Sequence, residues 1–168
     1  MTEKTRKESR QGSNLTEVMW PLVDLEGIDL RCSHLDYAYL CGSNLREADL
    51  RHCDMRGTDL RNADLQGADI RHSDLSGASF THANLRFADL RKTVLVGTDL
   101  VGADLRGANL DLSSWPLSCG TYMVKIDRRI FLQLLAHICS VEVDDEECQN
   151  VQEQLKPLAT KSHRALDL

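Results

Sequence analysis

The stretch TDLRNADLQGADIRHSDLSG, residues 58–77, places an apolar residue at every fifth position: Leu60, Leu65, Ile70 and Leu75. An α-helix turns about 100° per residue, so every fifth side chain would step about 140° around the axis and form no apolar stripe. A simple strand fails too, because its side chains alternate between two faces and an odd spacing sends successive leucines to opposite sides. The period therefore predicts a chain that turns a corner once in every five residues.

The pentapeptide Ala63–Gly67 shows how such a unit divides. If Leu65 points inward from a short extended segment, Ala63 points inward as well, Asp64 and Gln66 point outward, and Gly67 forms the turn. The glycines agree with this phase, because eight of the ten lie two residues after a central apolar residue, where a positive φ is needed. These eight are Gly27, Gly42, Gly57, Gly67, Gly77, Gly97, Gly102 and Gly107.

The apolar position recurs every five residues from Leu25 to Leu110, with only Met, Ile and Phe replacing Leu. Leu15 and Trp20 precede this run in the same phase, and Trp115 follows it. We predict that the central residues form the core, above all Leu45, Leu50, Leu60, Leu65, Ile70, Leu75, Phe80, Leu85, Leu90, Leu100 and Leu105. A second inward column, Ser33, Cys53, Ser73 and Thr93, is small and polar and should hydrogen-bond to nearby backbone.

The repeats ADLQG, ADLRG, TDLRN and ANLRF resemble those of the pentapeptide-repeat family over about residues 13 to 117. The resemblance implies an all-β solenoid, a right-handed quadrilateral β-helix with four pentapeptides per coil. The residue pattern itself gives corners and an inward pair but does not choose four sides over three. With four sides, residues twenty apart would stack about 4.8 Å from each other.

Composition divides the chain into three segments. Residues 1–12 are predicted to be a disordered basic arm, since the first fourteen residues carry four bases and two acids. Residues 13–117 form the repeat β-helix. Residues 118–168 are predicted to be a helical cap or a dimerisation segment, because an open coil exposes core and backbone groups at its end.

The expected cap contains an amphipathic pattern in KIDRRIFLQLLAHICSV, where Ile126, Ile130, Leu134 and Ile138 recur at four-residue spacing beside Phe131. Three outward valines, Val94, Val96 and Val101, form an apolar patch near the end of the repeats. We expect the helix face with Ile130, Leu134 and Ile138 to cover this patch while Trp115 closes the interior. A second copy of the chain is the alternative cover.

Catalytic and metal chemistry find little support in the sequence. No nucleophile, base and acid can be assembled into one set, so we expect neither an enzyme nor a bound cofactor. Cys32, His52 and His72 share a corner column, but a flat ladder does not converge ligands tetrahedrally, and Lys92 ends the column with a positive charge. The scattered cysteines favour free thiols in a reducing compartment.

Outward charges form two rows on one side of the coil. Asp29, Asp49, Asp69 and Asp89 stack, and Arg31, Arg51, Arg71 and Arg91 lie two residues later. The arginines are a candidate binding face for an anion or a phosphate backbone, but paired rows of opposite sign largely neutralise each other. A self-compensated, solvated face is the favoured interpretation.

For function, we predict a non-catalytic scaffold that binds an unidentified protein partner, with a homodimer through the C-terminal segment as a further expectation. The alternative comes from the family resemblance, which implies that some members mimic DNA and bind type II topoisomerases such as gyrase. Residues 15–112 carry sixteen acids and ten bases, which is a mild excess for a DNA mimic and argues against a general nucleic-acid binder. The absence of a long apolar run predicts no membrane span and a cytoplasmic protein.

Overall fold

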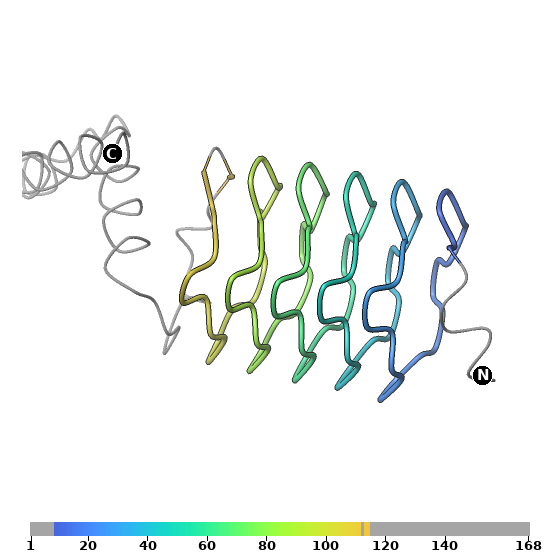
Figure 1. The fold of residues 1–168 in the computed structure, drawn as a ribbon, viewed down its shortest axis with the longest axis horizontal. Coiled ribbons are helices and arrows are strands. Elements are labelled where there is room, and N and C mark those ends of the chain that lie inside the picture. The colour runs from blue at the N-terminus through green and yellow to red at the C-terminus, as the bar shows by residue number, and fades with distance from the viewer. Residues whose placement is uncertain (1–8, 112, 115–168) are drawn as a thin grey trace, which may run out of the picture. The chain divides into compact units, whose positions relative to one another are not determined.

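The computed structural model describes residues 9–111 and 113–114, which form a stack of coils (Figure 1). Every β-bridge is parallel and joins a residue to the one twenty positions later, from Asn14↔His34 to Val94↔Ser114. Twenty residues are four pentapeptides, so this register decides for four sides per coil. All described residues belong to the first of two units into which the chain divides, Met1–Lys125 and Ile126–Leu168.

The sides of the coil are shorter than β-strands. Each pentapeptide has two turn residues and at most one bridged residue, so the described part contains isolated bridges and no strand. The expectation of a β-helix built from strands is corrected to this extent, because the corners take up too much of each repeat. The described part also contains no helix that could span a membrane. The predicted helical cap at 118–168 lies outside the described residues.

We name the four faces by their central residues. Face A contains Leu30, Leu50, Ile70, Leu90 and Leu110, and face B contains Leu15, Leu35, Met55, Leu75 and Leu95. Face C contains Trp20, Leu40, Leu60, Phe80 and Leu100, and face D contains Leu25, Leu45, Leu65, Leu85 and Leu105.

Backbone hydrogen bonds join each coil to both of its neighbours. The Leu65 amide donates to the Asn84 carbonyl at 2.8 Å, and the Asp69 amide donates to the Ala48 carbonyl in the preceding coil at 2.9 Å. The Ala68 amide closes the corner by donating to the Leu65 carbonyl at 3.0 Å. Most amides of the repeat therefore have backbone acceptors, as buried backbone groups require.

The amide directly after the central residue has no backbone acceptor in the described part. At most turns a side-chain oxygen accepts its hydrogen bond instead. In the Asp64–Gln66 turn, the Gln66 amide donates to Asp64 Oδ1 at 3.1 Å. Fourteen turns, this one included, have the same bond to an Asp or Asn immediately before the central residue, and at Gln11 the acceptor is Ser9 Oγ at 3.4 Å. This bond explains why the repeat prefers Asp or Asn at that position.

The corner residue lies two positions after the central residue, and its φ is positive at every described corner from Gly12 to Gly107. All eight glycines that the sequence assigned to this position have it, as does Gly12. Eleven other residues adopt it as well, with φ between 55° and 62°. The corner therefore tolerates side chains at the usual cost of the left-handed region, about 1–2 kcal/mol.

The core runs through the centre of the coils. The eleven central residues named from the sequence are between 0% and 2% exposed. The small inward column is also buried, and its hydrogen bonds confirm the expected backbone partners: Ser33 Oγ donates to Arg10 O, Cys53 Sγ to Leu30 O, Ser73 Oγ to Leu50 O and Thr93 Oγ1 to Leu90 O. Burial raises the pKa of the Cys53 thiol to about 12, so this cysteine stays protonated.

The coil hydrogen bonds begin at Arg10, earlier than residue 13, where the leucine period placed the first repeat. The Arg10 and Gly12 amides donate to the Asp29 and Arg31 carbonyls, both at 2.8 Å. Arg10 occupies a central position, and its guanidinium lies 5.4 Å from the centroid of the Trp20 ring. An arginine at a central position interrupts the apolar period, which is why the sequence pattern missed this first repeat.

Ala68→Leu should destabilise the protein by about 1–3 kcal/mol, because Ala68 is fully buried and the core has no room for added methylenes. Gln66→Leu is the control on the outward side, where only a hydrogen bond to Arg46 is lost and the cost should stay below about 1 kcal/mol. Urea unfolding would measure both. Equal losses would contradict the inward and outward assignment.

Asp74→Ala should cost about 1 kcal/mol, because the Ser76 amide loses its acceptor, Asp74 Oδ1, at 3.0 Å. Asp74→Asn keeps an oxygen in the same place and should retain most of the stability. Both variants remove one negative charge, so their thermal unfolding can be compared without a difference in net charge. If Asn were as destabilising as Ala, the side-chain bond would not be what stabilises the turn.

Candidate functional site

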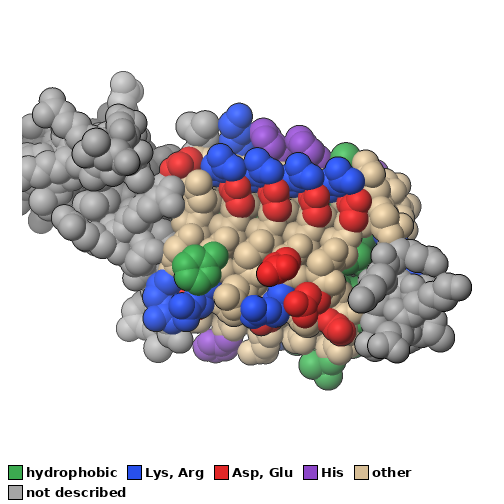
Figure 2. All heavy atoms as spheres, viewed as in Figure 1, with side chains coloured by type: hydrophobic (Ala, Val, Ile, Leu, Met, Phe, Trp, Pro, Cys, Tyr) green, Lys and Arg blue, Asp and Glu red, His purple; other side chains and the backbone are tan. Residues whose placement is uncertain are grey.

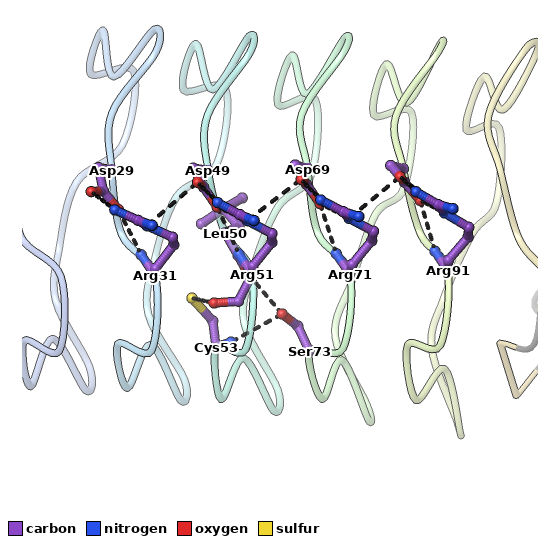
Figure 3. A network of polar contacts seen from close by, with 11 residues as sticks. Asp29, Arg31, Asp49, Leu50, Arg51, Cys53, Asp69, Arg71, Ser73 and Arg91 are labelled. Carbon is purple, nitrogen blue, oxygen red and sulfur yellow. Dashed lines mark hydrogen bonds and ion pairs between the residues drawn. The ribbon is translucent and has the colours of Figure 1, made fainter.

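Face A contains a continuous ladder of ion pairs (Figure 3). Arg51 Nε and Nη2 donate to the two carboxylate oxygens of Asp49 at 2.8 and 2.6 Å, and Nε lies 3.5 Å from Asp69 Oδ2 in the next coil. Arg31, Arg71 and Arg91 pair in the same bidentate way with the Asp two residues earlier. Figure 2 shows the resulting parallel rows of basic and acidic side chains.

The ladder neutralises its own charges. Hydrogen bonds from Arg51 hold the pKa of Asp49 below its ordinary value against the opposing effect of burial, and the same bonds raise the pKa of Arg51. Asp29 is affected in the same direction by Arg31. Because each guanidinium already has a bidentate carboxylate, the predicted anion-binding role of Arg31, Arg51, Arg71 and Arg91 stays a prediction that this geometry does not favour.

The corner column of Cys32, His52, His72 and Lys92 does not form a ligand set. The rings of His52 and His72 are stacked, with centroids 4.8 Å apart and an angle of 11° between planes. Ring nitrogens donate to a metal in the plane of the ring, so two nearly parallel stacked rings do not converge on one ion. Burial lowers the pKa of His72, and the nearby charges of His52 and Lys92 act in the same direction.

A different group of potential metal ligands, which the sequence analysis missed, lies on face B. The donor atoms of His34, Asp36 and Asp54 all lie within 4.8 Å of one another. However, His34 Nδ1 is 2.8 Å from Asp54 Oδ2, and Arg56 Nε donates to Asp36 Oδ1 at 2.7 Å. The hydrogen bond from Arg56 is the main cause of a lowered Asp36 pKa. The group therefore consists of an Arg56–Asp36 ion pair and a His34–Asp54 contact between adjacent coils, with the Arg56 guanidinium in place of a metal ion.

Exposed apolar side chains gather at the N-terminal end of face C and at its corners. Met19 is 68% exposed, Leu22 82% and Tyr37 66%, and Tyr39 is half-buried. Met19 and Tyr39 are bridged neighbours in adjacent coils, and Tyr37 and Leu22 occupy the corners on either side of face C. We call Met19, Leu22, Tyr37 and Tyr39 the N-terminal apolar patch.

The corner side chains of this patch lie over glycines of the next coil. A methyl group at Gly42 would be 2.6 Å from Leu22 Cδ2, and one at Gly57 would be 2.7 Å from the Tyr37 ring. The two glycines therefore give the large side chains room to lie along the surface. The sequence contains a signal for this patch, because its four residues break the polar pattern of the outward positions. Val94, Val96 and Val101 break it in the same way, and the sequence prediction used only these valines.

The predicted apolar patch of Val94, Val96 and Val101 is smaller than expected in the described part, because only two of the three valines are exposed. Val94 is 40% exposed and Val96 61%, whereas Val101 is half-buried. Phe87, on the corner after face D, is 58% exposed with Arg86 5.5 Å from its ring centroid. The residues predicted for the cap or interface, of which Ile130, Leu134 and Ile138 were expected to cover the valines, lie outside the described residues: Trp115, Ile130, Phe131, Leu134 and Ile138.

Comparison with known families supports the resemblance read from the repeats. The family model of pentapeptide repeats matches residues 11–46, 43–81 and 73–111, with eight copies. The chain belongs to the pentapeptide-repeat family. The register of four pentapeptides per coil agrees with the quadrilateral fold that this membership implies.

Solved structures of pentapeptide-repeat proteins are similar to the chain. Rfr23 from the cyanobacterium Cyanothece 51142 has 25% identity and a TM-score of 0.52, with 75% of this chain and 90% of Rfr23 covered. A protein from the Arabidopsis thaliana thylakoid lumen has 27% identity and a TM-score of 0.52, with 73% of this chain and 75% of that protein covered. No curated protein matches the sequence significantly.

A more distant structure is that of QnrB1, a plasmid-mediated fluoroquinolone resistance protein. It has 21% identity and a TM-score of 0.45, with 84% of this chain and 76% of QnrB1 covered. At this distance the match carries no functional argument.

Acid should lower the free energy of unfolding, because it protonates carboxylates of the ion-pair ladder on face A. An unfolded Asp has a pKa of about 3.9, and that of Asp49 is lower when folded, so the unfolded chain takes up protons first as the pH falls. The stabilisation is fully present above about pH 4 and is lost as the pH falls through the folded pKa. Urea unfolding as a function of pH would measure this decline.

Arg51→Gln should make the decline shallower, because the Asp49 pKa returns toward its ordinary value. Arg86→Gln is the matched control, since Arg86 has no ion-pair partner among the described residues. The same acid dependence in wild type and Arg51→Gln would show that the ladder does not cause it.

Proposed function

We propose that the protein is a non-catalytic pentapeptide-repeat scaffold that binds a protein partner through the N-terminal apolar patch. The observation that carries this proposal is the exposure of Met19, Leu22 and Tyr37 on a surface whose other outward positions are mostly polar. Exposed apolar clusters of this kind are typical of protein interaction sites. Aromatic residues and Met are also enriched at the centre of such interfaces.

The remaining polar groups support a binding role over a catalytic one. The Asp residues of the repeat accept amides at the turns, as Asp64 does, or pair with arginine, as Asp49 does. The one thiol in the described core, Cys53, is buried and protonated. These groups hold the coil together, whereas the exposed side chains of the N-terminal apolar patch take no part in those contacts among the described residues.

The charge distribution does not favour the topoisomerase alternative. Residues 15–65 carry ten acids and five bases, and residues 66–111 carry six acids and five bases, a net −5 against −1. A DNA mimic needs negative potential along its length. In addition, face A is neutralised by Arg31, Arg51, Arg71 and Arg91.

Affinity capture from an extract of the source organism tests the proposal. The double variant Met19→Glu, Leu22→Glu should lose at least tenfold of a specifically captured protein, because charged side chains would have to be desolvated in the interface. Glutamate already occupies a corner at positive φ at Glu17 and Glu47, so Leu22→Glu should fold.

Phe87→Glu, Val96→Glu is the matched control, with the same charge change at exposed apolar residues elsewhere. The control should capture as much partner as the wild type. Equal capture by both double variants would exclude the N-terminal apolar patch as the binding site. A gyrase supercoiling assay should show no effect of the protein.

A further inference from the structure

Three carboxylates border the N-terminal apolar patch on both sides. Glu17 occupies the corner column of Tyr37, one coil earlier, and Asp24 and Glu26 follow Leu22 onto face D. All three residues are exposed. We call Glu17, Asp24 and Glu26 the acidic rim.

The acidic rim differs from the row of aspartates on face A in lacking cations. Among residues 9–111 and 113–114, no Lys or Arg lies within ion-pair distance of these three carboxylates. Asp24 and Glu26 accept hydrogen bonds from the neutral amide of Asn44 at 2.9 and 3.2 Å, so no described residue compensates their charge. On face A, by contrast, every Asp from Asp29 to Asp89 has its arginine.

We propose that the N-terminal apolar patch binds a basic amphipathic segment of another protein, whose apolar side chains contact Met19, Leu22, Tyr37 and Tyr39 while its Lys or Arg side chains pair with the acidic rim. This inference rests on the proposed scaffold function and adds the chemistry of the partner. An interface whose apolar centre is flanked by charges of one sign selects a partner of the opposite sign and disfavours others.

A second copy of the chain fits this surface poorly. In a two-fold contact the same patch faces itself, so Glu17, Asp24 and Glu26 of one copy would face the same carboxylates of the other. Like charges brought together in an interface cost several kcal/mol. Residues 1–8 of the chain, MTEKTRKE, are basic but contain one apolar residue, Met1, which is too little to cover four apolar side chains.

The test uses three labelled peptides of about 18 residues that share one apolar helical stripe and differ in their polar face, which is Lys, Gln or Glu. Fluorescence anisotropy would measure their affinity for the full-length protein. The Lys peptide should bind at least tenfold more tightly than the Gln peptide, and the Glu peptide more weakly still. The preference should shrink as salt is raised, because rim charges are screened.

Two charge-matched variants separate the acidic rim from overall charge. Glu17→Gln, Asp24→Asn, Glu26→Gln should abolish most of the preference for Lys over Gln. Glu47→Gln, Asp54→Asn, Asp74→Asn changes the net charge equally at carboxylates away from the patch and should keep it. In both triples Asn keeps the side-chain oxygen at the turn position, which Asn44 and Asn84 also supply.

The outcomes distinguish this inference from the proposed function. Equal binding of the Lys and Gln peptides, or equal loss of preference in the two triple variants, would overturn the basic-partner inference but leave the scaffold function standing if Met19→Glu, Leu22→Glu still abolishes capture. No binding of any peptide would also overturn the inference. Failure of the capture experiment alone would instead remove the scaffold function on which it rests. A dimer that sediments as such in the wild type and dissociates in Met19→Glu, Leu22→Glu would place a second copy on the patch and contradict the proposal.

Discussion

One amide per pentapeptide governs much of the chemistry of this protein. The amide after each central residue has no backbone acceptor in the described part, whereas the other amides bond across the coils or close the corner. At fourteen turns, an Asp or Asn side chain accepts the hydrogen bond of the amide that follows the central residue. The fold therefore favours a short side chain with an oxygen at that position, although Met19, Tyr39 and Val94 show that single repeats form without one, and the high Asp content follows from this preference.

The stacked aspartates explain the positions of the arginines. A carboxylate repeated every twenty residues would repel its neighbours about 4.8 Å away, and an arginine two residues later removes the repulsion within the same repeat. Arg31, Arg51, Arg71 and Arg91 each pair in this way on face A, and Arg61 does so on face C. The most conspicuous charged rows thus have a structural cause. Under the proposal made above, the acidic side chains that select the partner are those of the acidic rim, which have no arginine among the described residues.

The sequence predicted the phase of the repeat well because leucine and glycine report it independently. Leu65 and Gly67 both mark one corner, and agreement over many repeats leaves no other register. The number of sides came from the resemblance and then from the twenty-residue bridges. Arg10 was missed because a charged residue at a central position breaks an apolar period. The N-terminal apolar patch was missed because the sequence prediction compared only the valines with the polar outward pattern, although Met19 and Tyr39 are twenty residues apart and are bridged neighbours in the structure.

The glycines beneath Leu22 and Tyr37 imply a rule of spacing for this surface. A bulky corner side chain occupies the volume in which the Cβ of the corner residue twenty positions later would lie, as also holds for His82 over Gly102 and Phe87 over Gly107. Leu22, Tyr37, His82 and Phe87 are thus each followed by a glycine at the same corner of the next coil, whereas His52 and His72 stack as two flat rings. Large side chains and glycines should consequently be inherited as pairs, and moving a recognition residue along the solenoid would require moving its glycine with it.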